Sequence, residues 1–270
     1  MKKYGSALAF GILAGAMVVF PREAAAAALQ GLMLFAQSVL PVLGPFMVCM
    51  LMLSSRLGGS PPWAAALSWL SGSPGGARMM QLYSLRGKTA LRYAAITGTM
   101  SPMFFLGTVE QWLGNAGGGW LIFLSHVLGA IASGLCFRGK KEKAEAHPVP
   151  TPFFQALRDA AQALLTVALC MMLGCTAAKM AACALPGLSP VWAAALQCGL
   201  EVTAGTQALI ALHLPHTPAL VCAACSFGGL SLLLQNAAFW QESGVGMGKL
   251  LLVRLLHGIF SFFVCLLLGG

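Results

Sequence analysis

Two stretches of this chain, Ser71-Gly72-Ser73-Pro74-Gly75-Gly76 and Glu201-Val202-Thr203-Ala204-Gly205-Thr206, decide how it folds. Each ends an apolar segment with small residues that interrupt a helix. The two clusters lie at a fixed spacing, because Gly75 and Gly205 are 130 positions apart. The occurrence of two similar clusters 130 positions apart predicts that the chain contains two related halves.

A polar interruption of the next apolar segment follows each cluster. The first interruption runs from Thr97 to Pro102 and the second from Ser226 to Gln235. Ser101 in the first and Ser231 in the second are again 130 positions apart. Matched breaks in apolar segments are typical of binding sites built from two repeats inside a membrane.

Composition places the chain in a lipid bilayer. Of its 270 residues, 58% are hydrophobic and only 9% are charged, whereas a soluble domain carries roughly 25% charged residues. The formal net charge of +9 does not indicate a nucleic-acid partner, because the Lys and Arg residues stand between apolar segments, where they set membrane orientation. We expect a polytopic membrane protein and no nucleic acid.

The apolar segments predict an all-α transmembrane bundle, since an open sheet leaves backbone groups unpaired in lipid. We expect helices at 5–21, 25–54, 61–73, 93–112, 118–137, 155–184, 190–203, 216–240 and 248–268. Segments 61–73 and 190–203 are shorter than the roughly 20 residues that a crossing needs. Because each ends in one of the two clusters, we expect re-entrant hairpins there.

The distribution of basic residues predicts the topology. With a cytoplasmic N-terminus, 14 of the 16 Lys and Arg residues lie on the cytoplasmic side, as the positive-inside rule requires. These are Lys2, Lys3, Arg56, Arg78, Arg86, Lys88, Arg92, Arg138, Lys140, Lys141, Lys143, Arg158, Lys249 and Arg254, while Arg22 and Lys179 lie outside.

The same topology divides the chain into four parts. We expect a retained N-terminal transmembrane helix at 1–24, a first repeat at 25–137, a cytoplasmic basic linker at 138–154 and a second repeat at 155–270. Each repeat has three crossings and one hairpin, which gives about seven crossings in all. An odd number of crossings per repeat makes the second repeat inverted relative to the first, as in secondary transporters.

Two charged residues near the clusters are candidates for function. Arg78 offers a guanidinium for a carboxylate substrate, or it is an orienting charge at the end of a shallow hairpin. Glu201 stands in a long uncharged stretch. Three roles are open for Glu201: it takes up a proton during transport, it pairs with Arg78, or it caps the half-helix that follows.

The freed backbone groups at the breaks either bind an anion or allow close packing of small residues. The substrate-site prediction contains the clusters and the breaks together. It comprises Ser73, Gly75, Gly76, Arg78, Thr99, Ser101, Glu201, Thr203, Gly205, Thr206, Ser226, Gly228, Gly229, Ser231 and Gln235.

Other chemistry finds little support in the sequence. The histidines do not have metal-ligand spacing with carboxylates, and Cys222-Ala-Ala-Cys225 lacks a second cysteine pair. No nucleophile–base pair or Gly-x-Ser-x-Gly turn is present. We therefore expect no enzyme activity, no catalytic residue, no metal site and no cofactor.

Several runs resemble the sporulation integral membrane protein YlbJ/SpoVV family. That family carries the nucleoside recognition or Gate-type module, which is similar to the core of concentrative nucleoside transporters. The resemblance rests on Gly31-Leu32, Val39-Leu40-Pro41, Pro45-Phe46, Ser71 to Arg78, Ser101-Pro102-Met103-Phe104, Glu201 to Gly205, and Ser226 to Ser231 with Gln235.

The resemblance implies transport of dipicolinic acid across the mother-cell-derived outer forespore membrane. The cargo would be a small planar dianion, and a proton or sodium ion would be the coupling ion. A nucleoside carrier of the same fold and a non-transporting scaffold in spore-envelope assembly stay open as alternatives. Ser73 replaces a family tyrosine, Gly98 and Thr99 replace paired asparagines, Ser101 replaces a glycine and Leu233 replaces a polar residue.

Overall fold

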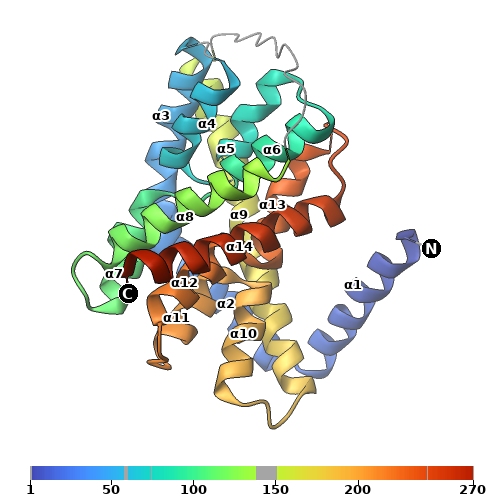
Figure 1. Cartoon of the computed structure of the whole chain (residues 1–270). Coiled ribbons are helices and arrows are strands. Elements are labelled where there is room, and N and C mark those ends of the chain that lie inside the picture. Colours follow the sequence, from blue (N-terminus) through green and yellow to red (C-terminus); the bar gives the residue numbers. More distant parts are fainter. Residues whose placement is uncertain (1, 58–59, 74, 138–150, 242, 270) are drawn as a thin grey trace.

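The structure is a computed structural model that describes residues 2–57, 60–73, 75–137, 151–241 and 243–269. Every regular element in these ranges is a helix, which confirms the all-α prediction (Figure 1). Most of the predicted 138–154 linker, residues 138–150, lies outside the described residues.

The first half contains α1 (Lys2–Val19), α2 (Pro21–Leu34), η1 (Phe35–Val39), α3 (Leu40–Leu57), α4 (Pro61–Ser71), α5 (Gly75–Met80), η2 (Gln81–Tyr83), α6 (Gly87–Thr97), η3 (Phe104–Val109), α7 (Glu110–Leu113) and α8 (Gly118–Leu135). The second half contains α9 (Phe153–Ala184), α10 (Pro190–Leu200), α11 (Val202–Ile210), α12 (Thr217–Phe227), α13 (Gly229–Trp240) and α14 (Met247–Gly269).

Five stretches in the described part of the chain are long and apolar enough to cross a membrane. They are Pro21–Leu53, Gly118–Leu135, Phe153–Ala184, Thr217–Ala237 and Met247–Gly269. The predicted crossing at 93–112 is not one continuous helix, because α6 ends at Thr97 and the π-helical η3 begins at Phe104. The polar run between them opens the backbone.

Helix α14 shows how the protein distributes its side chains. Its outer face carries Leu255 and Ile259, which are 46% and 52% exposed, while Arg254 and His257 on its inner face are buried. A soluble protein arranges these groups in the opposite sense. Apolar outside and polar inside is the arrangement of an integral membrane protein, in which lipid covers the outer face.

The order of elements in the first half is repeated in the second. Helices α6 and α12 have the same length and start 130 positions apart, at Gly87 and Thr217. The short α4 and α10 likewise begin with proline at Pro61 and Pro190. These two helices confirm the short apolar segments that we expected at 61–73 and 190–203. A helix break follows α6 in the first half and α12 in the second.

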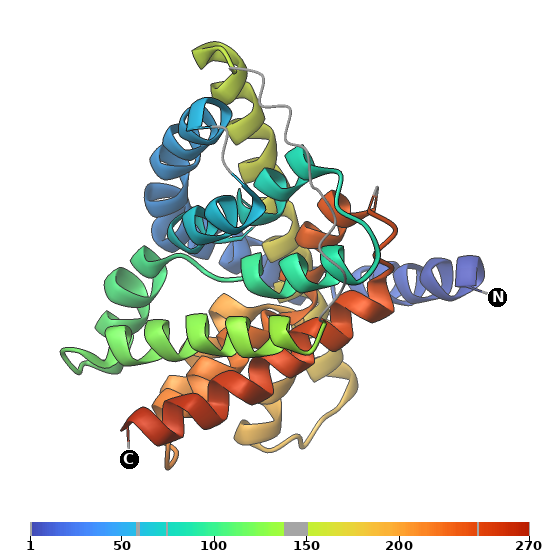
Figure 2. The ribbon, with the colours of Figure 1, turned by 45° about the horizontal axis from the view of Figure 1, so that its top comes forward.

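Helices α8 and α14 lie side by side in both views (Figures 1 and 2). They are antiparallel, because Gly129 faces Ser261 near the middle while Leu121 faces Gly269 near the ends. The two backbones approach so closely that a Cβ on Gly129 would lie 2.8 Å from the Ser261 Cα. Glycine therefore sets the distance between these helices.

The long stretch α2–η1–α3 packs against α9 in the same manner. Gly31 contacts the Met172 backbone, and Met47 packs with Ala160 at the opposite end of the contact. This pair is also antiparallel. In contrast, α1 projects away from the rest of the molecule in both views (Figures 1 and 2).

We predict that Gly129→Ala destabilises the protein, because the added methyl group forces α8 and α14 apart. Overpacking of this kind costs about 1–3 kcal/mol. Gly11→Ala in α1 is the matched control, since no atom lies within 4 Å of its Cβ position. Thermal unfolding in detergent measures both variants. Equal stability of the two variants would contradict this account of the crossing.

Candidate functional site

In each half of the chain, the turn between two short helices packs against the helix break of the same half. The helix pairs are α4 with α5 and α10 with α11. In the first half, the Ser73 N–H donates to the Thr99 carbonyl at 2.7 Å, which ties the turn after α4 to the break after α6. In the second half, Gly229 at the break lies against the Cys198 carbonyl of α10. Both turns therefore pack closely against a break, and the first one also supplies a hydrogen-bond partner for opened backbone.

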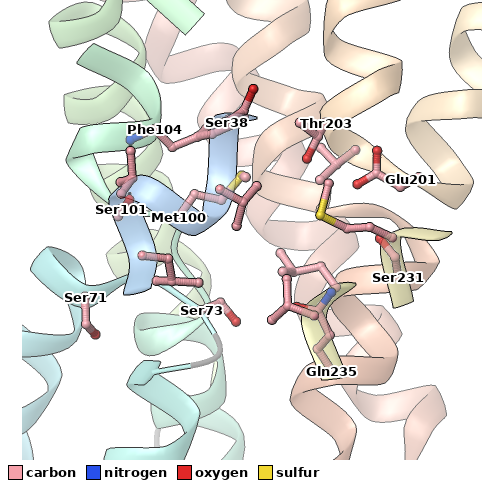
Figure 3. A pocket seen from close by; sticks show the side chains of 17 residues that line it. Ser38, Ser71, Ser73, Met100, Ser101, Phe104, Glu201, Thr203, Ser231 and Gln235 are labelled. Carbon is pink, nitrogen blue, oxygen red and sulfur yellow. Dashed lines mark hydrogen bonds between the residues drawn. The ribbon is translucent and has the colours of Figure 1, made fainter. Parts of the chain in front are cut away.

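A cavity of about 60 Å³ lies where these turns and breaks meet. Figure 3 shows Ser71, Ser73, Ser101 and Phe104 on one side of it, and Glu201, Thr203, Ser231 and Gln235 on the other. Its remaining lining residues are Ser38, Val39, Val42, Leu43, Met100, Val167, Met171, Val202 and Leu232. We call this cavity the central pocket. Both halves of the chain contribute to it, and its size suits a few water molecules.

Among the residues that the structure describes, Glu201 is the only ionisable one that lines the central pocket. It separates α10 from α11, is 1% exposed, and accepts the Ala204 N–H at 2.7 Å through Oε2. The carboxylate thus caps α11, whose N-terminal end favours negative charge. Gly174 of α9 makes room for it, because a Cβ there would lie 2.9 Å from the Glu201 Cβ.

The polar groups around Glu201 differ in how fully they are paired. Ser73 donates to the Asn236 Oδ1, a contact that joins the two halves of the chain. Gln235 Oε1 and Thr99 Oγ1 are buried without a hydrogen-bond partner among the described residues. Because Gln235 lines the central pocket, it offers a free acceptor there.

Arg78 does not reach Glu201. Its Nη2 pairs with the Asp159 Oδ2 at 3.0 Å, and the two side chains are 42% and 20% exposed. They line a separate cavity of about 210 Å³. A smaller cavity of about 20 Å³ is lined by both residues and by Ser71, which also lines the central pocket. Arg78 therefore does not line the central pocket, but it lines a small cavity that shares Ser71 with it.

The predicted site residues fall into two groups. Ser73, Ser101, Glu201, Thr203, Ser231 and Gln235 line the central pocket. The others lie behind it and hold the backbone: Gly75, Gly76, Gly205 and Gly229 allow close approach of neighbouring segments, Thr206 contacts the Cys225 sulfur, and Ser226 contacts His126. Gly228 closes α12 with a positive φ of 81°, where glycine is favoured.

The structure adds residues that the sequence reasoning missed. Ser38 and Val39 reach the pocket from the π-helical η1, and Phe104 reaches it from η3. π-Helical turns often occur at functional sites. Pro41 and Pro45, which follow η1 within a helix, are the sequence signal for this distortion.

Arg254 was counted among the orienting charges on the cytoplasmic side, and the structure shows that its side chain does not lie at the protein surface. Its side chain is 3% exposed and lies in the interior, where it donates to the Phe227 carbonyl at 2.9 Å. The expectation came from counting charge along the sequence, which does not reveal the face of α14 that carries the residue.

Comparison with known proteins gives one partial likeness. The chain is 33% identical over 121 residues to the sporulation integral membrane protein YlbJ of Bacillus subtilis strain 168. The match covers 42% of this chain and 30% of YlbJ. No family model matches the chain, and no solved structure matches it. The chain is thus a membrane protein with a sporulation membrane protein among its relatives.

We predict that Glu201→Ala destabilises the protein more than Glu201→Gln. Glutamine keeps an oxygen that accepts the Ala204 N–H, whereas alanine leaves that donor unpaired. Loss of an N-cap costs about 1 kcal/mol. Thermal unfolding in detergent compares the two variants. If both variants lose the same stability, the negative charge and not a neutral cap is what α11 requires.

We predict that Arg78→Ala changes stability by less than about 1 kcal/mol, because partly exposed ion pairs contribute little. Asp159→Ala, which removes the other partner, is expected to have the same small effect. Unfolding midpoints in detergent test both changes. A large loss for either variant would show that the Arg78–Asp159 pair holds α5 to α9.

Proposed function

We propose that this chain is a carrier and not an enzyme, and that it moves a small metabolite through the central pocket by alternating access. The observation that carries this proposal is the pocket itself: a partly open, largely apolar cavity whose wall also holds a buried carboxylate and several hydroxyl groups, where two matched helix breaks meet. Buried polar groups of this kind inside a membrane mark substrate or ion pathways.

We further propose an inverted repeat with about seven crossings and two re-entrant hairpins. The antiparallel packing of α8 with α14, and of α2–η1–α3 with α9, supports this proposal, because these elements correspond in the order of the two halves. The hairpins are α4 with α5 and α10 with α11. Helices of 11 residues, such as α4 and α10, are too short to cross.

The proposed cargo is dipicolinate, carried across the outer forespore membrane during sporulation with the N-terminus of the carrier in the cytoplasm. The likeness to YlbJ supports the link to sporulation. The hydroxyl groups of Ser73, Ser101 and Thr203 suit carboxylate oxygens, and Phe104 suits the ring. Glu201 repels a dianion unless it holds a proton, which makes a proton the favoured coupling ion.

A nucleoside is the second candidate cargo, and a specific observation favours it. Glu201 and the unpaired Gln235 Oε1 both accept hydrogen bonds. Sugar hydroxyls and base N–H groups are donors that match such acceptors, and a nucleoside carries no charge that Glu201 would repel. The pocket must widen for either cargo, as alternating access requires.

We predict that Glu201→Gln lowers the rate of dipicolinate uptake about tenfold or more, as expected for loss of an interaction with a charged group. Uptake of labelled dipicolinate into proteoliposomes, with and without a proton gradient, measures the effect. Glu110→Gln is the matched control. Glu110 also accepts one backbone N–H, that of Gly119 at a helix start, but it does not line the pocket.

The same vesicles separate the alternatives. Uptake of labelled nucleoside without uptake of dipicolinate would replace the proposed cargo and keep the carrier. No uptake of either compound by correctly folded and oriented protein would overturn transport and favour the scaffold in spore-envelope assembly.

A further inference from the structure

A single buried arginine joins the two helix breaks. Arg254 of α14 donates through Nε to the Phe227 carbonyl at 2.9 Å and through Nη1 to the Gly98 carbonyl. Phe227 is the last residue of α12, and Gly98 is the residue that ends α6. One guanidinium therefore binds the carbonyl ends of both half-helices.

The positive charge of Arg254 is offset by helix ends and not by a carboxylate of the described residues. The hydrogen bonds of Arg254 go to two carbonyls and to His257 Nδ1, so no carboxylate among the described residues pairs with it. The carbonyl end of a helix carries roughly half a negative elementary charge. Two such ends together offset roughly one positive charge, which is what the guanidinium brings.

The chain makes room for the guanidinium at two matched positions. A Cβ on Gly98 would overlap the Arg254 Nη1, and a Cβ on Gly228 would lie 2.6 Å from its Nη2. Gly98 and Gly228 are 130 positions apart, the spacing of the two halves. Both breaks thus lack a side chain where the arginine enters.

A histidine makes a second link between the breaks. The Met100 N–H in the first break donates to His126 Nε2 at 2.9 Å, so this nitrogen is the acceptor. The proton of a neutral ring then sits on Nδ1, which lies 2.6 Å from the Ser226 Oγ at the second break. His257 Nε2 donates to the His126 carbonyl at 2.8 Å and closes the cluster.

The residues that follow these contacts form the pocket wall. Met100 and Ser101 belong to the first break, and Ser231 and Gln235 belong to α13, which begins directly after Gly228. We infer that Arg254 is a positioning residue that fixes the two breaks relative to each other and thereby sets the shape of the central pocket. This inference rests on the proposed function only in treating that pocket as the substrate site.

The first test measures pocket shape without transport. Ser101→Cys is placed in a full-length chain whose nine native cysteines are replaced by alanine, and its rate of reaction with a water-soluble methanethiosulfonate is measured. Arg254→Met is expected to change this rate about tenfold. Arg254→Lys, which keeps a charged donor, is expected to restore part of it.

Val253→Ala is the matched control, because Val253 is also buried on α14 and its apolar side chain donates no hydrogen bond to either break. It weakens packing and is expected to leave the Ser101→Cys rate unchanged. An equal change of rate in Val253→Ala and Arg254→Met would overturn the positioning role and leave a general structural one.

A second measurement covers the case in which Arg254→Met does not fold. Gly98→Ala displaces the guanidinium while keeping the arginine, so it is expected to alter the Ser101→Cys rate and to lower the melting temperature in detergent. The thermal effect should become smaller when Arg254→Ala supplies the space, and the part that stays reflects the Ala94 carbonyl oxygen, 2.9 Å from the added Cβ. An unchanged labelling rate in Gly98→Ala would overturn the inference. Failed uptake in vesicles would instead bear on the proposed function alone.

Discussion

Every backbone amide and carbonyl that a break opens inside this protein must find a partner, because lipid supplies none. The breaks after α6 and α12 free several such groups in the interior. Arg254 binds the carbonyls of Gly98 and Phe227, and His126 takes the Met100 N–H. The turns, breaks and pocket all depend on this internal supply of partners.

The same requirement explains why the pocket forms where it does. Opened backbone can exist at depth only if it is covered by protein or faces a polar cavity. The Ser73 N–H donates to the Thr99 carbonyl and so covers one part of the opened backbone. Glu201 covers another part by capping α11. Gln235, whose Oε1 has no partner among the described residues, lines the cavity. Thr99 Oγ1 and Arg254 Nη2, which belong to residues outside the pocket wall, are likewise unpaired. Unpaired polar groups therefore lie both in the pocket wall and behind it.

The sequence predicts the local features well, because they depend on neighbouring residues. Pro61 and Pro190 start the two short helices, and small residues end them. The polar run from Thr97 to Pro102 predicted an interruption in the first half, and α6 ends at Thr97 while η3 begins only at Phe104. The presence of Ser101, Glu201 and Ser231 in one pocket also follows from the matched spacing.

Contacts between distant segments could not be read in this way. Arg78 pairs with Asp159 of α9, and nothing in the spacing of these residues indicates that α5 and α9 meet. Arg254 was counted among the orienting charges because the positive-inside rule places it on the cytoplasmic side. Only the packing of α14 against α6, α8 and α12 shows that this side chain points inward.

The two matched breaks share one cation. The carbonyl ends of α6 and α12 together offset roughly one positive charge, and the guanidinium of Arg254 supplies it through its bonds to Gly98 and Phe227. A cation at only one of these ends would leave the other carbonyl end without a charged donor. Because Arg254 comes from α14 alone, charge balance at the two breaks depends on a residue that one half of the chain supplies.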